Sequence, residues 1–273
     1  MTSQCYLMSV SEFWDGVEGE RLLKAALEKV DDERRKKVEA MKAVKPQAAC
    51  VGAGLLLQLA VQEALTVAGG ADAGGTDGTE SDLSDLVSTG MERLWRSAVD
   101  MKADSAADAE GFRVYSALHV MELVERPIEL VMDYGEKGKP YLREYPLFFN
   151  LSHSGEYVVC AVSDREIGVD IQKCSNMNVM RIAKRFFSEE ECRALETCET
   201  GEERRQFFFR LWVRKEAYGK FLGKGIMGVV SENLLPDESC RAAEKELLWR
   251  EWSFPEGYKI AMCQLAQMAS AAN

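Results

Sequence analysis

One segment of this chain, residues 207–225 (FFFRLWVRKEAYGKFLGKG), restricts the possible folds more than any other. It carries six aromatic side chains, at spacings that leave a helix with little free surface. Other elements of the chain must therefore cover this helix. Trp212, Glu216 and Lys220 follow one another at intervals of four residues, so they share one face. We expect Glu216 and Lys220 to be partly buried beside a partner, although an exposed Glu–Lys pair on an amphipathic helix is the common alternative and contributes little.

The strand expected at residues 167–172 (IGVDIQ) carries the second informative pattern. Alternate side chains of a strand point to opposite faces, so Gly168, Asp170 and Gln172 share one face. The apolar residues between them predict a side that faces a core. A carboxylate beside a bare glycine leaves room for a ligand on the other side. An ordinary half-buried strand with a polar outer face is the simpler interpretation of this strand alone.

Residues 150–155 (NLSHSG) contain His153, one of only two histidines in the chain. A serine beside a histidine suggests hydrolase chemistry, but adjacent side chains point apart in a strand and the chain has no GxSxG motif. We interpret the segment instead as a turn whose hydroxyls, imidazole and backbone N–H groups face an anion. The other histidine, His119, falls in an apolar segment that we expect to be a strand, and its expected role is structural.

Charge is unevenly distributed along this acidic chain, whose net charge is −11. The balance argues against nucleic acid as a partner. Bases nevertheless gather in residues 34–45 and 204–224, which either bind an anion or form solvated helix faces. Residues 71–110 hold ten acids and three bases, and their run of glycines cannot bury enough surface to order itself. We therefore expect residues 69–110 to be a mobile insertion.

The sequence carries no signal for export or for a membrane. It starts without a basic and apolar signal pattern, and its longest apolar stretches, such as residues 52–60, are too short to span a bilayer. Its eight cysteines form no CxxC pair, so neither a structural zinc site nor disulfides are expected. These features predict a soluble cytoplasmic protein with reduced thiols and no membrane partner.

Periodicity and turn residues predict the order of the elements. A first helix is interrupted near Asp31 and Asp32, and Pro46 opens a second, mostly buried one. Ser188 is an expected N-cap, with Glu191 in the capping-box position. The expected helices cover residues 22–38, 48–65 and 204–222, and the expected strands lie between residues 111 and 172 and at 247–252 and 258–265.

The order of these elements repeats weakly along the chain. A charged helix, a buried helix and a group of strands occur in the first part and again in the second. This suggests an α+β fold of two similar halves, each a small antiparallel sheet with a long helix, related by a pseudo-twofold axis at a cleft. We place the halves at residues 1–165 and 166–273.

Taken in order, the motifs resemble one family. NLSHSG, a strand, IGVDI, FFSEEE and LWVRKEAYGK follow one another at the spacing of the 4′-phosphopantetheinyl transferase superfamily, of the larger Sfp type. The resemblance is strongest over residues 138–225 and weaker toward both ends. Each motif alone is ordinary, but all of them in this order make a chance match improbable.

The resemblance implies roles for three residues of the expected catalytic centre. In that family the Asp of GVDI and the Glu of KEA, here Asp170 and Glu216, coordinate Mg²⁺ on the pyrophosphate of coenzyme A, and carboxylate oxygens suit this metal. The Glu also helps to deprotonate the serine of the carrier protein, directly or through a water. Lys220 would neutralise charge on the phosphoryl group in transfer.

The resemblance also implies residues that hold coenzyme A. Ser152 and His153 match the family's contact to the phosphates, and Lys139 and Pro140 match its GKP turn beside the adenine and ribose. The family places bases before its first long helix to hold the 3′-phosphate, and Arg34 and Lys37 stand at suitable positions.

The sequence departs from the family pattern at two places. An Arg usually precedes the helix glycine, but residues 48–52 read AACVG, and Lys45 is the alternative base for the 3′-phosphate. Many relatives carry a third acidic metal ligand where this chain has Gln172, whose amide can bind the metal directly or hold a metal-bound water.

The implied function is transfer of 4′-phosphopantetheine from coenzyme A to a serine of an acyl- or peptidyl-carrier protein. The reaction would depend on Mg²⁺ and release adenosine 3′,5′-bisphosphate, and the enzyme would be a monomer with coenzyme A in the cleft. A catalytically weak module that binds coenzyme A or a carrier protein is the main alternative, and Gln172 and the missing Arg favour it. A plain hydrolase ranks third, because the nucleophile geometry is missing.

Overall fold

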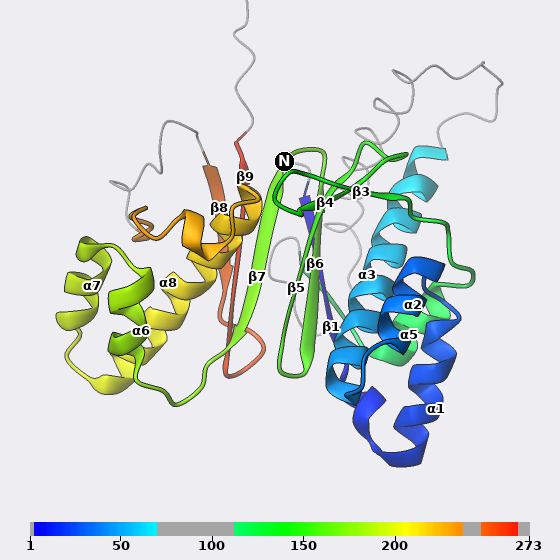
Figure 1. Cartoon of the computed structure of the whole chain (residues 1–273), viewed down its shortest axis with the longest axis horizontal. Coiled ribbons are helices and arrows are strands. Elements are labelled where there is room, and N and C mark those ends of the chain that lie inside the picture. The colour runs from blue at the N-terminus through cyan, green and yellow to red at the C-terminus, as the bar shows by residue number, and fades with distance from the viewer. Residues whose placement is uncertain (1–2, 70–111, 237–246, 267–273) are drawn as a thin grey trace, which may run out of the picture. The chain divides into compact units, whose positions relative to one another are not determined.

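The computed structural model describes residues 3–69, 112–236 and 247–266 and has a mixed α+β fold (Figure 1). The chain divides into two compact units, one of residues 2–135 and 140–164 and the other of residues 136–139 and 165–273. Nearly all of the expected insertion at 69–110 lies outside the described residues, and so does Cys240. The other seven cysteines are free thiols.

The sheet of the first unit has four strands in the order β2-β1-β6-β5. Its strands are β1 (Ser3–Ser9), β2 (Phe112–Tyr115), β5 (Phe148–Ser154) and β6 (Tyr157–Ser163). The expectation of a purely antiparallel sheet is wrong here, because β1 and β2 are parallel. More than a hundred residues connect these two strands, which is ample for the crossover that a parallel pair requires. A two-stranded sheet of β3 (Met132–Tyr134) and β4 (Pro140–Leu142) completes the unit.

Helices of the first unit begin with η1 (Ser11–Trp14), α1 (Gly16–Leu27) and α2 (Asp32–Glu39). The expected interruption near Asp31 is confirmed, because its carboxylate caps α2 by accepting a hydrogen bond from the Arg34 N–H at 2.8 Å. The long helix α3 (Val44–Gly69) packs on β6 and supplies more residues to the core of this unit than any other element. Its apolar part, Val44–Leu65, is long enough to cross a membrane, but 78% of the most apolar 18-residue stretch within it is buried, as in a core helix.

His119 does not lie in a strand, so that prediction is wrong. Ser116 ends the extended segment and caps helix α5 (Ala117–Leu123) by accepting a hydrogen bond from the His119 N–H at 3.1 Å. The buried residues from here on, Ala117, Val120, Met121 and Val124, have the spacing of one helix face. The sequence pattern changed from strand to helix at the serine, and His119 is exposed on the helix surface.

The second unit has the antiparallel sheet that was expected, with strand order β7-β9-β8. Its strands are β7 (Ile167–Lys173), β8 (Leu247–Trp252) and β9 (Tyr258–Leu265), and its helices are α6 (Val179–Phe186), α7 (Glu189–Glu196), α8 (Gly201–Phe221) and the short η2 (Ile226–Gly228). The capping box of Ser188 and Glu191 is confirmed at the start of α7. Helix α8 packs on β7 and β9, and α6 and α7 lie beside it (Figure 1).

Candidate active site

Two elements of the second unit bring Asp170, Glu216 and Lys220 together. Asp170 lies in the middle of β7, and its side chain is only 8% exposed. Lys220 of α8 reaches it with an Nζ–Oδ1 distance of 2.8 Å and also donates to the Val169 carbonyl at 3.2 Å. Glu216, one turn before Lys220 on α8, interacts electrostatically with both Asp170 and Lys220. The two carboxylates and the ammonium group therefore form one charged cluster.

The pKa of Glu216 reflects this cluster. Burial raises the pKa of the Glu216 carboxyl, and the nearby negative charge of Asp170 raises it further. The ammonium of Lys220 partly opposes both effects. Glu216 is therefore a stronger base than an exposed glutamate, and a cation placed between the two carboxylates would relieve their repulsion.

The face of α8 that carries this cluster is its more open side. Within residues 211–221 the partly exposed side chains are those of Trp212, Glu216 and Lys220, and all the others are buried. Trp212 stacks on Phe208, with ring centroids 5.8 Å apart. The helical spacing of four thus identified the right face, and the neighbouring aromatic residues keep its charged groups from becoming fully solvated.

Gly168 has a different role from the one expected. A Cβ atom built there would lie 2.1 Å from the Ala217 carbonyl oxygen and 2.6 Å from the Phe221 backbone N. The missing side chain therefore allows close approach of α8 to β7 and leaves no room for a ligand at this point. This close approach brings Asp170 to the helix residues Glu216 and Lys220.

Lys139 contacts the same pair of elements. Its Nζ donates to the carbonyls of Ile167 at 3.2 Å and Phe221 at 3.0 Å and forms an ion pair with Glu166. A lysine has three N–H donors, so these contacts engage all of them. Lys139 thereby ties the first residue of β7 to the last residue of α8, and its expected contact with coenzyme A stays a prediction.

We expect Lys139→Met to destabilise the protein. The change keeps much of the side-chain volume but leaves two carbonyl oxygens without their donor, which costs about 1–3 kcal/mol. Thermal or denaturant unfolding measures this loss, and Lys137→Met, at an exposed position on the same turn, is the matched control. Equal stability of the two variants, with loss of coenzyme A affinity only in Lys139→Met, would favour the ligand role.

Gln172 follows Asp170 at the spacing that places both on one side of β7. It is partly exposed, and its amide nitrogen donates to the Lys173 carbonyl at 3.3 Å. The side chain is thus weakly held near the end of the strand. Its role toward a metal stays a prediction.

Ser152 and His153 belong to the first unit, and they lie in a strand. The segment expected as a turn forms most of β5, with Ser152 opposite Val159 and His153 opposite Val158. The turn into β6 consists of Gly155, at φ 57°, and Glu156. Ser152 is buried and His153 is exposed, so their side chains point apart and do not converge on one anion.

The bases of the first unit differ in their surroundings. The Arg34 side chain is 15% exposed; it donates to the Cys50 carbonyl at 3.2 Å and lies against Gly54 of α3. Lys37 is exposed on α2, and Lys45 lies over the Trp14 ring at 4.9 Å. Arg34 is therefore engaged by α3, and Lys37 is the more accessible of the two expected bases.

The donor set of the second unit fits a divalent cation such as Mg²⁺. Among the described residues no group of three or more His, Cys, Asp and Glu side chains could enclose a metal ion. Asp170 and Glu216 nevertheless offer two carboxylates, and Mg²⁺ usually takes one or two carboxylates and completes its shell with water and substrate phosphates. The two residues suit a metal that arrives with a phosphate ligand better than a closed protein cage.

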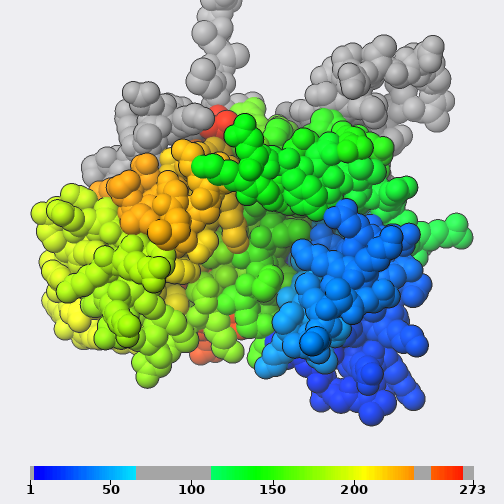
Figure 2. Space-filling model, in the orientation of Figure 1, coloured from blue at the N-terminus to red at the C-terminus, as the bar shows by residue number. Residues whose placement is uncertain are grey.

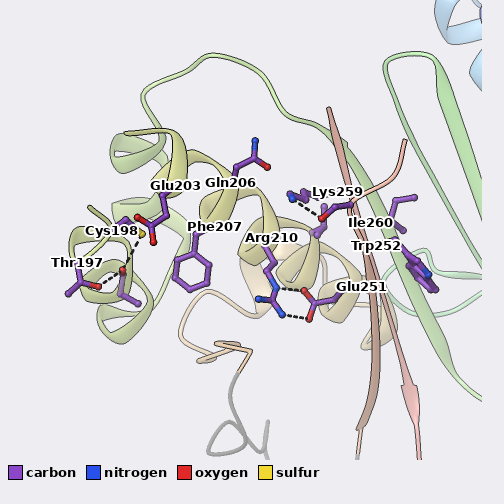
Figure 3. Close-up of a pocket in the computed structure, with 13 residues that line it drawn as sticks. Thr197, Cys198, Glu203, Gln206, Phe207, Arg210, Glu251, Trp252, Lys259 and Ile260 are labelled. Carbon is purple, nitrogen blue, oxygen red and sulfur yellow. Dashed lines mark hydrogen bonds and ion pairs between the residues drawn. The ribbon is translucent and has the colours of Figure 1, made fainter. Parts of the chain in front are cut away.

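A cavity of about 670 Å³ lies elsewhere in this unit (Figure 3). Residues of α7, α8, β8 and β9 line it, and Asp170, Glu216 and Lys220 do not. Two of its charged side chains, Arg210 and Glu251, pair with each other at an Nε–Oε2 distance of 2.6 Å. The Lys259 ammonium donates to the Ser253 hydroxyl at 2.8 Å. We therefore base the candidate site on the charged cluster and not on this cavity.

Sequence reasoning missed one charged pair beside the site, Lys215 and Glu191. Both side chains are completely buried, and their Nζ–Oε2 distance is 2.9 Å. The available signal was helical periodicity, because Lys215 falls between the buried positions Leu211 and Tyr218.

The part of the chain that carries Asp170, Glu216 and Lys220 is also the part that matches a known protein family. Residues 166–263 match the model of the 4′-phosphopantetheinyl transferase superfamily. The chain is similar to 4′-phosphopantetheinyl transferase psf-1 of Bacillus pumilus, 35% identical over 153 residues, or 53% of this chain and 65% of the relative. It is also similar to 4′-phosphopantetheinyl transferase Sfp of Bacillus subtilis (strain 168), 35% identical over 142 residues, or 47% of this chain and 60% of the relative.

A more distant organism provides a third relative. L-aminoadipate-semialdehyde dehydrogenase-phosphopantetheinyl transferase of Xenopus laevis is 36% identical over 110 residues, which cover 36% of each chain. This chain therefore spans less than two thirds of the length of each of these curated relatives.

Proposed function

This chain belongs to the 4′-phosphopantetheinyl transferase superfamily, and from that premise we propose that it transfers the 4′-phosphopantetheine arm of coenzyme A to a serine of an acyl- or peptidyl-carrier protein, with Mg²⁺. The observation that carries the proposal is the charged cluster. Asp170 of β7 and Lys220 of α8 are 2.8 Å apart, and Glu216 shares their electrostatic environment, within the residues that match the family.

In the proposed reaction the serine oxygen of the carrier attacks the β-phosphorus of coenzyme A. The new bond joins that oxygen to phosphorus, and the bond to the bridging oxygen breaks, which releases adenosine 3′,5′-bisphosphate. Glu216 takes the serine proton, directly or through a water, and its raised pKa makes it a better base for this step. Lys220 offsets the negative charge that develops on the transferring phosphoryl group.

Asp170 and Glu216 would hold the metal. Bound there, Mg²⁺ would supply positive charge to the pyrophosphate oxygens. The close packing at Gly168 keeps both carboxylates at fixed positions on β7 and α8. Ser152, His153, Arg34, Lys37, Lys139 and Pro140 stay the proposed contacts to coenzyme A, and Lys45 stays the alternative base for the 3′-phosphate.

The test is direct transfer by the full chain. The protein is incubated with coenzyme A, Mg²⁺ and an apo-carrier protein, and intact mass spectrometry follows the carrier. We expect the carrier to gain one phosphopantetheine, and chelation of the metal should prevent the gain. Binding of coenzyme A or carrier without any mass gain would favour the alternative, a binding module that lacks efficient catalysis.

We propose that Gln172 contributes less to the metal site than Asp170 does. A neutral amide attracts Mg²⁺ less than a carboxylate, and the Gln172 amide nitrogen already donates to the Lys173 carbonyl. Gln172→Ala should therefore reduce turnover much less than Asp170→Ala, and Gln172→Glu should raise Mg²⁺ affinity in calorimetric titration. Equal damage from the two alanine variants would mean that Gln172 is a direct ligand or orients the carrier serine.

The remaining expectations are also part of the proposal. The enzyme would act as a monomer in the cytoplasm, with its two halves related by a pseudo-twofold axis. Size-exclusion chromatography with light scattering measures the oligomeric state.

A further inference from the structure

The buried ion pair of Lys215 and Glu191 joins three parts of the second unit. Lys215 of α8 meets Glu191 of α7 at 2.9 Å, and both side chains are 0% exposed. The Lys215 ammonium also donates to three backbone carbonyls of the segment after η2, those of Val229 at 3.1 Å, Val230 at 3.1 Å and Glu232 at 2.6 Å. Its charge and its donors are therefore fully engaged inside the protein.

Glu191 is engaged as completely as its partner. One carboxylate oxygen accepts the Ser188 N–H at 2.8 Å in the capping box, and the other accepts the Leu234 N–H at 2.9 Å. Figure 2 shows the segment that follows α8, in orange, directly beside the yellow-green surface of α6 and α7. One ion pair thus connects the start of α7, the middle of α8 and residues 229–234.

Stability alone does not account for such a pair. Removal of two charges from water is costly, and well-packed apolar side chains of similar volume are often as stable as a buried ion pair. Burial lowers the pKa of Lys215, which reflects that cost. The pair does fix the orientation of α8, because each hydrogen bond of Lys215 restricts the rotation of this helix about its own axis.

Three consecutive charged residues of α8 make this rotation consequential. Successive residues of an α-helix point about 100° apart, so Arg214, Lys215 and Glu216 face three different directions. The Arg214 guanidinium donates to the Leu234 carbonyl at 2.7 Å and forms an ion pair with Glu251 of β8. Lys215 faces α7, and Glu216 is left facing Asp170 of β7.

We propose that Lys215 and Glu191 are a positioning pair, which fixes the rotation of α8 so that Glu216 and Lys220 meet Asp170. The inference rests on the proposed function and assigns Lys215 no contact with substrate. A small rotation of α8 would leave the core apolar but would move the Glu216 carboxylate away from the metal, and misplacement by about 1 Å can cost about a hundredfold in rate.

The first test compares the loss of one member of the pair with the loss of both. In Lys215→Met or Glu191→Gln one charge stays buried without its partner, and we expect the Tm to fall by about 10 °C. Gln can still serve in the capping box. In the double variant both charges of the pair are gone, so most of the lost Tm should return. Lys184→Met, at an exposed position on α6, is the control and should melt like the wild type.

The second test measures positioning in the double variant, at a temperature where circular dichroism shows it folded. We expect its kcat to fall at least tenfold while its KM for coenzyme A changes less than about threefold, because the ligand contacts are intact. Calorimetry should also show weaker Mg²⁺ binding in the presence of coenzyme A. Wild-type kcat and wild-type Mg²⁺ affinity in the double variant would overturn the proposal.

The design keeps the two proposals distinguishable. If the wild-type protein transfers nothing, the proposed function fails, and the Mg²⁺ titration of wild type against double variant alone decides the positioning role. Equal Mg²⁺ affinity in that comparison overturns it. A large rise in KM for coenzyme A with unchanged kcat would instead make Lys215 a ligand contact and also overturn it.

Discussion

Replacement of Asp170 or Glu216 by alanine is expected to lower the rate of phosphopantetheine transfer by about three orders of magnitude or more. Each change removes one of the two carboxylates proposed to hold the metal, and Glu216→Ala also removes the proposed base for the serine proton. In Asp170→Ala, Lys220 would lose the carboxylate with which it forms an ion pair. In Glu216→Ala, Lys220 would lose a second nearby negative charge. The loss should appear mainly in kcat, because the interactions concerned strengthen in the transition state.

Steady-state transfer to an apo-carrier, followed by mass spectrometry, measures this effect. Asp170→Asn and Glu216→Gln are the matched isosteric variants, which keep the side-chain volume. Their unfolding temperatures show whether the fold survives. An alanine variant of either residue that retains more than about a tenth of wild-type turnover would remove it from the catalytic centre.

The pH dependence gives an independent check on the same pair. Glu216 cannot accept a proton once it is protonated, so transfer should fall as the pH drops through its raised pKa. Asp170 is one cause of that elevation. The residual activity of Asp170→Asn should therefore persist to lower pH than that of the wild type, and a shift to higher pH would contradict the assigned coupling.

Gly168→Ala is expected to be the most disruptive small substitution in the described residues of the second unit. The added Cβ would lie 2.1 Å from the Ala217 carbonyl oxygen and 2.6 Å from the Phe221 backbone N, and backbone atoms of a packed helix cannot rotate away. We expect a loss of about 3 kcal/mol or more in unfolding free energy. Any folded protein should also lose activity, because a displaced α8 carries Glu216 and Lys220 away from Asp170.

Denaturant unfolding and transfer kinetics together measure the consequences of this substitution. Gly201→Ala is the matched control, since Gly201 is the first residue of α8 and nothing lies within 4 Å of a Cβ built there. That variant should be at least as stable as the wild type, because alanine favours a helix more than glycine does. Wild-type stability of Gly168→Ala would show that α8 does not pack closely on β7.

Local signals in the sequence were sufficient for several elements. The capping box of Ser188 and Glu191, the strands Leu247–Trp252 and Tyr258–Leu265 and the break between α1 and α2 all follow from neighbouring residues. The shared face of Trp212, Glu216 and Lys220 followed from helical spacing, which depends on backbone geometry alone. These features depend on residues that lie close together in the sequence, so the sequence of one protein suffices to predict them.

Other local interpretations were wrong because strand pairing with a distant segment, or in one case an overlooked helix cap, decided the outcome. Residues 150–155 look like a turn, but pairing with β6 holds Asn150 to Ser154 in strand β5. His119 lies in an apolar stretch, but the Ser116 cap turns it into a helix. The parallel pairing of β1 with β2 joins segments more than a hundred residues apart, and no local pattern specifies such a partner.

The sequence by itself determined which charged residues belong to the candidate site, since Asp170, Glu216 and Lys220 stand out by spacing and by motif. Only the tertiary structure decided how they are held together. Gly168 permits the close approach of α8, Lys139 ties β7 to the end of α8, and Lys215 connects α8 to α7. These contacts join residues from about 20 to 80 positions apart, so their energies depend on packing that local propensity does not encode.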